Sequence, residues 1–82
     1  MERDIKSIVV LLLTQAMINL GEIRDPVHQS TRVFLDKGKV FVDLLEVLQE
    51  KTRGNLTPAE EEYLDQVVHN VREVYRRKAR EE

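Results

Sequence analysis

The sequence predicts an all-α fold, a small bundle of three main helices that forms a single helical domain over residues 1–82. A chain of 82 residues is long enough for one hydrophobic core and too short for two. Its hydrophobic residues make up 41 % of the chain and are mostly aliphatic, because only 5 % of all residues are aromatic. Glycine and proline divide the chain into three long segments whose apolar residues recur at helical spacing.

We expect the first helix over about residues 4–20. Asp4 is a suitable N-cap, since its carboxylate can accept a hydrogen bond from the first turn. Gly21 can adopt the left-handed conformation that commonly follows a helix. β-Branched residues within the segment would also suit a strand, but a segment of this length that ends in glycine favours a helix. An ordered connector follows at residues 21–35, where Pro26 interrupts the helical pattern.

The second helix is expected over about residues 36–53, with Asp36 as its N-cap and Gly54 at its end. Gly38 falls in the first turn and weakens this start. Its apolar residues predict one core-facing arc, from which Val42 alone points away. The residues of this predicted arc are Val40, Phe41, Leu44, Leu45, Val47 and Leu48.

The third helix is expected over about residues 57–80 and has the clearest start in the chain. Thr57 can cap the helix, Pro58 fits its first position, and Glu60 completes a T-x-x-E capping box. One apolar arc runs along this helix, as expected for a helix that packs on a single core. Its residues are Tyr63, Leu64, Val67, Val68, Val71, Val74 and Tyr75.

The first helix carries more apolar residues than one core-facing arc holds. That arc consists of Ile5, Val9, Val10, Leu12, Leu13, Ala16, Met17 and Leu20. Leu11 and Ile18 project roughly opposite to it and belong to a row of small and aliphatic residues that a second helix can approach closely. The row predicts self-association, in its simplest form a homodimer, whereas the alternative is that the connector covers Leu11 and Ile18 in a monomer. The row consists of Ser7, Leu11, Thr14 and Ile18.

The charge balance argues against a general attraction to nucleic acid, because 13 basic and 15 acidic residues give a net charge of −2. A local basic cluster near the C-terminus is nevertheless a candidate contact for a polyanion. The same cations also complement the dipole of the third helix, and no aromatic residue lies between them to stack on bases. The cluster consists of Arg72, Arg76, Arg77, Lys78 and Arg80.

Residues suited to metal or acid–base chemistry lie on polar helix faces, where solvated side-chain contacts are the favoured interpretation. One such group on the third helix consists of Glu62, Asp65, His69 and Glu73. An acidic row on the second helix consists of Asp43, Glu46 and Glu50. With no cysteine and no clustered glycines, the sequence predicts no metal site, no cofactor and no catalytic residue.

Two stretches, TQAMINLGEIRDPV and DLLEVLQEKTRGNLTPAEEEYLDQVVHNVR, resemble a bacterial family of small all-helical domains known as domain of unknown function 1844. Arg24 and Gly38 depart from the family pattern, which tends to have proline at the first position and a better helix former at the second. The resemblance implies a helical fold in a bacterial, cytoplasmic setting. It implies no catalytic residue, since none is established for the family.

We therefore expect a non-enzymatic protein-interaction module that associates with itself through its first helix and presents its acidic row or basic end to an unidentified protein. The alternative is a nucleic-acid- or ribosome-associated factor that uses the basic C-terminal cluster. An enzyme would need a concave site around the connector and His28. The longest apolar run, residues 8–13, is far shorter than the roughly 20 residues that span a bilayer, so we expect a cytoplasmic location without membrane contact.

Overall fold

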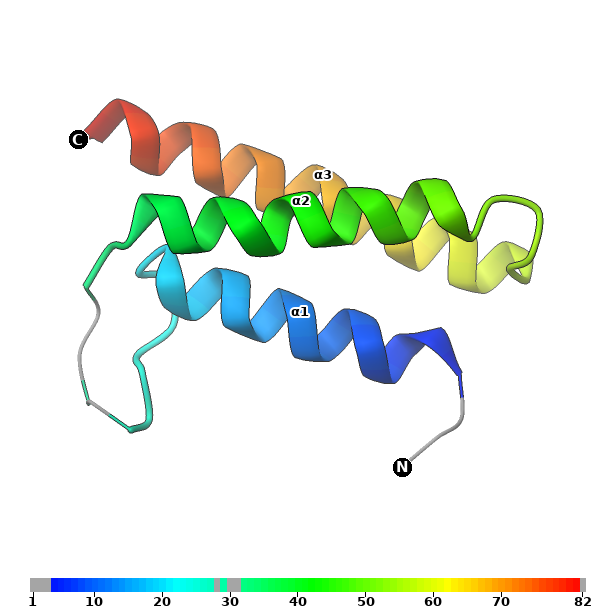
Figure 1. Cartoon of the computed structure of the whole chain (residues 1–82), viewed down its shortest axis with the longest axis horizontal. Helices are drawn as coiled ribbons and strands as arrows, with labels where there is room; N and C mark the ends of the chain where they lie inside the picture. The colour runs from blue at the N-terminus through cyan, green and yellow to red at the C-terminus, as the bar shows by residue number, and fades with distance from the viewer. Residues whose placement is uncertain (1–3, 28, 30–31, 82) are drawn as a thin grey trace.

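The computed structural model describes residues 4–27, 29 and 32–81. These residues form three helices and no strand, so the predicted all-α fold is confirmed. The middle helix packs against both of the others and runs opposite to them along the bundle (Figure 1). The helices are α1 over Ile5–Asn19, α2 over Leu35–Lys51 and α3 over Pro58–Glu81.

Two helix starts that the sequence predicted from side-chain caps are confirmed. The carboxylate of Asp4 accepts a hydrogen bond from the Lys6 N–H at 2.9 Å before α1. Before α3, the Thr57 N–H donates to the Glu60 carboxylate at 2.9 Å, and the Glu60 N–H donates to the Thr57 hydroxyl at 3.2 Å. These reciprocal bonds satisfy N–H groups that the first turn of a helix leaves without a partner. Gly21 follows α1 with a φ of 77°, as the sequence predicted.

The start of α2 differs from the prediction. The helix begins at Leu35 after Phe34, whose side chain forms no cap, and Asp36 lies in the first turn instead of at the N-cap. Its last residue, Lys51, also lies slightly before the predicted end. The reason for the early start is a tertiary contact, because the Phe34 N–H donates to the Asn19 carbonyl at 2.6 Å and so fixes where the chain enters α2.

The predicted core-facing arc of α2 is only partly confirmed, because the helix is rotated relative to it: only Phe41, Leu45 and Leu48 of its six members lie in or against the core. Val42, which was expected to point away, is 2 % exposed, and it is buried together with Gly38 and Leu45. Phe41 and Leu48 are only partly buried against the core. The apolar arc of this helix is wider than one core needs, so the packing partner decides which part is buried. The three residues left exposed are Val40 at 53 %, Leu44 at 43 % and Val47 at 48 %.

The core is aliphatic and receives residues from all three helices. The predicted arc of α3 is confirmed, since four of its members are buried and the other three are partly buried. In α1 the predicted arc holds except for Val10, which is 48 % exposed because it lies at the margin of the arc. The buried hydrophobic residues are Val9, Ala16, Leu20, Val42, Leu45, Leu64, Val67, Val68 and Val71.

A close contact joins Leu20, the C-cap residue of α1, to Gly38 in α2. A Cβ atom added at Gly38 would lie 2.5 Å from Cδ2 and 2.8 Å from Cγ of Leu20. Leu20 itself is fully buried, so its side chain has little room to move. The sequence singled out Gly38 as unfavourable for the first turn of a helix, and the structure shows that it permits the end of α1 to approach α2 this closely.

We expect Gly38→Ala to lower the free energy of unfolding by about 1 kcal/mol. Alanine favours a helix over glycine by about 1 kcal/mol, but overpacking a filled core costs about 1–3 kcal/mol. In a Leu20→Ala background the methyl group has space, and the same substitution should raise the free energy of unfolding by roughly 0.5–1 kcal/mol. Urea denaturation of the four proteins measures both effects, and equal effects in the two backgrounds would contradict the close approach.

Candidate functional site

The self-association row predicted on α1 is exposed mainly at one residue. Leu11 is 61 % exposed, whereas the other three members, Ser7, Thr14 and Ile18, are half-buried. Ile8 next to this row is 50 % exposed, so it adds apolar surface. The candidate surface on α1 is therefore centred on Leu11 and is narrower than the full predicted row.

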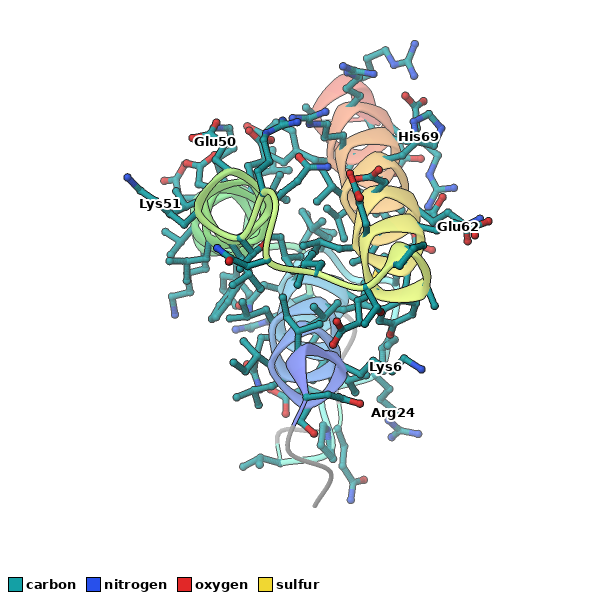
Figure 2. All side chains as sticks on the ribbon, turned by 90° about the vertical axis from the view of Figure 1, so that its right-hand side faces the viewer. Lys6, Arg24, Glu50, Lys51, Glu62 and His69 are labelled. Atoms are coloured by element: carbon teal, nitrogen blue, oxygen red, sulfur yellow. The ribbon has the colours of Figure 1, made fainter. Side chains whose placement is uncertain are left out.

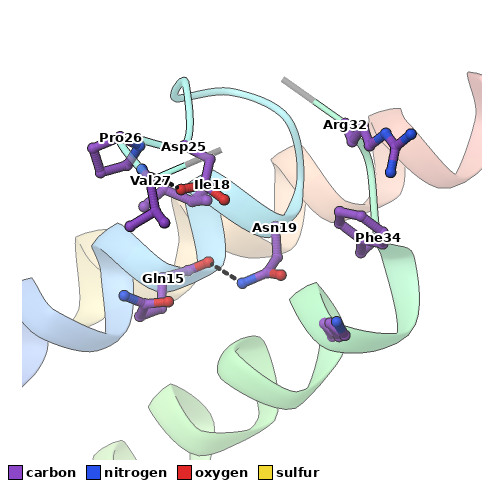
Figure 3. Close-up of a pocket in the computed structure, with 9 residues that line it drawn as sticks. Gln15, Ile18, Asn19, Asp25, Pro26, Val27, Arg32 and Phe34 are labelled. Carbon is purple, nitrogen blue, oxygen red and sulfur yellow. Dashed lines mark hydrogen bonds between the residues drawn. The ribbon is translucent and has the colours of Figure 1, made fainter. Parts of the chain in front are cut away.

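The connector accounts for the partial burial of Ile18. Ile18 lines an open cavity of about 750 Å³ together with Pro26, Val27 and Phe34 of the connector (Figure 3). Leu11 is not part of this cavity wall. The connector thus borders Ile18 but leaves Leu11 exposed, so covering by the connector does not extend to both residues.

The polar groups of this cavity do not converge on one point. The Asn19 amide donates to the backbone carbonyl of Gln15 at 2.8 Å, and the Arg32 guanidinium points away from both residues (Figure 3). A site for catalysis or for a small ligand usually holds several polar groups aimed at one place. His28, which the enzyme interpretation invoked, lies outside the described residues.

A second exposed apolar row lies on α2 and was missed from the sequence, where its members were assigned to the core. Val40, Leu44 and Val47 follow one another at 4-3 spacing, so they share one side of the helix. Lys51 continues the row at the same spacing, and its side chain points away from both α1 and α3 (Figure 2). The signal that could have revealed this row is Gly38, since Gly38, Val42 and Leu45 form a parallel row that admits a close helix neighbour.

The acidic row predicted on α2 takes part in ordinary ion pairs. Asp43 accepts a hydrogen bond from Lys39 at 2.8 Å, and this bond raises the pKa of the Lys39 ammonium. Glu46 accepts one from Arg72 of α3 at 3.1 Å, which raises the pKa of that guanidinium and ties the two helices together. Glu50 points outward from α2 (Figure 2). The row is thus a solvated face, as the sequence favoured.

The basic cluster of α3 is largely neutralised within the chain. Arg72 pairs with Glu46, and Arg76 pairs with Glu73 at 2.6 Å. Arg77 pairs with Glu22 in the connector, as does Lys78 at 3.1 Å. Among the five residues of the cluster, only Arg80 forms no ion pair with a described carboxylate.

Glu22 joins the connector to the end of α3 by accepting from two cations at once. The hydrogen bonds from Arg77 and Lys78 hold the pKa of the Glu22 carboxyl below its usual range, and partial desolvation opposes them only in part. The side chain of Lys78 is only 16 % exposed, so this pair is less hydrated than a surface ion pair. The contact fixes the connector against α3, next to the end of α1.

The potential metal ligands on the polar face of α3 are not gathered into a metal site. Asp65 accepts a hydrogen bond from the Gln49 amide at 2.8 Å, whereas Glu62 and His69 point outward from α3 (Figure 2). In the described part of the chain, no group of three or more His, Asp or Glu side chains is placed to hold a metal ion. A search of the same residues finds no helix with both the length and the apolar character needed to span a bilayer.

Comparison with known proteins gives one match. The family model called domain of unknown function (DUF1844) matches residues 2–77, which is most of the chain. No curated protein and no solved structure matches the chain. The family that the sequence motifs indicated is therefore confirmed.

The contact of Glu22 with α3 makes stability depend on pH. Because the folded-state pKa of Glu22 is lowered, its contribution is fully present above the ordinary carboxyl value of about 4.3 and is lost as the pH falls through the folded-state value. We expect Glu22→Gln to lower the free energy of unfolding by about 0.5–1 kcal/mol at pH 7, with a smaller difference from wild type below about pH 4. Urea denaturation at both pH values measures this difference.

The matched control is Glu62→Gln, which removes the same charge from an outward-pointing side chain of α3. Its effect at pH 7 should be smaller than that of Glu22→Gln. A loss for Glu22→Gln that stays the same at low pH would show that the ion pairs with Arg77 and Lys78 do not cause it.

Proposed function

Since the chain belongs to the DUF1844 family, which is described only as a domain of unknown function, we propose that it is a non-enzymatic interaction module of the bacterial cytoplasm that associates with copies of itself. The observation that carries this proposal is the exposed apolar surface centred on Leu11 of α1. Self-association in its simplest form is a symmetric homodimer, in which the same surface of each copy is buried.

The chemistry of α1 suits a protein contact. No charged side chain lies between Lys6 and Glu22, so nothing on the surface around Leu11 must be desolvated as an ion when a partner approaches. Burying an exposed leucine contributes about 1.5–3 kcal/mol, and the two-fold symmetry of a dimer makes this contribution twice. Among the described residues, α1 packs against α2 and α3, and no further helix covers the side of α1 that carries Leu11.

The alternative function, contact with a polyanion through the basic end of α3, has less support. Four of its five cations already face carboxylates of the same chain, so a phosphate would have to replace those partners. An exposed apolar surface, by contrast, has no competing partner to displace. The interaction module is therefore the function that the geometry supports best.

We expect Leu11→Asp to raise the dissociation constant of the self-associated state at least about tenfold, because it removes an apolar contact and adds a like charge on both copies. Sedimentation equilibrium over a range of concentrations measures the change. Thermal unfolding of the variant should stay within a few degrees of wild type, since Leu11 is mostly exposed.

The control Gln66→Asp adds the same charge at an exposed position of α3 and should leave the dissociation constant unchanged. A wild-type chain that stays monomeric at every concentration would contradict the proposed function. An unchanged dissociation constant for Leu11→Asp would remove α1 from the contact.

A further inference from the structure

The apolar row of α2 that the sequence missed needs a partner of its own. Val40, Leu44 and Val47 are each about half exposed although all three are branched aliphatic residues. They lie on the side of α2 that Lys51 marks, away from both neighbouring helices (Figure 2). In a small domain a continuous apolar row of this kind is typical of a contact surface.

Charges at the two ends of the row are complementary when two copies of α2 meet in opposite directions. Asp36 and Lys37 lie before the row and Lys51 lies at its end, all about equally far from Leu44. The Lys37 ammonium lies over the Phe34 ring, 5.0 Å from its centroid, and lines the connector cavity, so Asp36 is the end group left to meet a partner. An antiparallel pair centred near Leu44 therefore brings Asp36 beside Lys51 of the partner subunit, twice. In a parallel pair Asp36 would instead lie beside Asp36 of the partner subunit, and Lys51 beside Lys51 of the partner subunit. Both contacts are repulsive.

The charges along one edge of the row are also complementary when the two copies of α2 are antiparallel. Lys39, Asp43 and Glu50 lie along one edge of α2 by helical spacing. In the antiparallel arrangement Lys39 comes close to Glu50 of the partner subunit. Asp43 lies near the centre and would face Asp43 of the partner subunit, but its ion pair with Lys39 at 2.8 Å offsets this repulsion.

These end charges are available for a contact between copies. Within the described part of the chain, no ion pair engages Asp36, Glu50 or Lys51. The carboxylates and cations that hold the bundle together are other residues, including Glu46 and Arg72 between α2 and α3. Pairing Asp36 with the partner's Lys51 therefore breaks no ion pair of the monomer.

We propose that α2 packs antiparallel on α2 of a second copy, with Val40, Leu44 and Val47 buried between them and Asp36 beside the partner's Lys51. This inference rests on the proposed self-association and specifies its geometry. Leu44 lies at the centre of this interface. Leu11 of α1 lies level with Val47 along the bundle, because α1 and α2 run in opposite directions and the two residues are equally far along their helices from the contact between Leu20 and Gly38.

The first test compares Leu44→Asp with Leu11→Asp by sedimentation equilibrium. Leu44→Asp should raise the dissociation constant more than Leu11→Asp does, and by at least about tenfold, because it places like charges at the two-fold axis. Circular dichroism should show the helical content of wild type, since the side chain of Leu44 is 43 % exposed and not part of the buried core. Gln66→Asp is again the control.

The second test uses charge reversal to fix the direction of packing. Asp36→Lys and Lys51→Glu should each weaken self-association by about three- to tenfold at low salt, since each single variant places like charges at both ends of its homodimer. Mixed in equal amounts, the two variants should associate as tightly as wild type. In a dimer of one Asp36→Lys chain and one Lys51→Glu chain, residue 36 of each copy lies beside residue 51 of the other with the opposite charge.

The outcomes separate this inference from the proposed function. Weaker association of each single variant, together with recovery in the mixture, supports the antiparallel α2 contact, since in a parallel pair neither single variant would lose an attraction. If the mixture associates no better than its components, or if Leu44→Asp has no effect while wild type still self-associates, the α2 contact is wrong and the proposed function stands. If wild type is a monomer at every concentration, both are wrong.

Discussion

The close approach of Leu20 to Gly38 is the constraint on which the rest of the structure depends. It brings the end of α1 and the start of α2 together at a point where Gly38 has no space for a methyl group. Because Gly38 must face α1, the rotation of α2 about its own axis is fixed. Val42 and Leu45 then turn into the core, and the row of Val40, Leu44 and Val47 turns out. One glycine thus decides which apolar residues of α2 hold the fold together and which are exposed.

The predictions from sequence succeeded where structure is determined locally. The capping box of Thr57 and Glu60 uses groups three positions apart, and the single apolar arc of α3 leaves no choice of which face to bury. In α2 the apolar residues cover more than one face, so periodicity alone did not decide between Val42 and Val40. That decision depends on α1, which approaches from elsewhere in the sequence. Gly38 was interpreted as a weak point of the helix, although it is also the position that α1 requires.

The candidate site shows the same division between local and distant contacts. Leu11 was found from the sequence because its exposure follows from the crowded arc of α1 alone. The burial of Ile18 was left open, since it depends on how the connector returns along α1. The ion pairs of Arg77 and Lys78 with Glu22 join α3 to the connector, with 55 positions between Glu22 and Arg77, and no helical spacing predicts them. They also explain why a cluster that looks basic in the sequence offers few free cations in the fold.

The large exposed apolar side chains are unevenly distributed over the bundle. Large exposed hydrophobic side chains of the described residues lie on α1, the connector and α2, and none lies on α3. The outer face of α3 instead carries outward-pointing polar residues such as Glu62 and His69 (Figure 2). α3 therefore serves as the polar outer layer that completes the core, while α1 and α2 retain apolar surface beyond what that core needs. A second copy that met this side would place both apolar surfaces in one interface and leave both α3 helices in water.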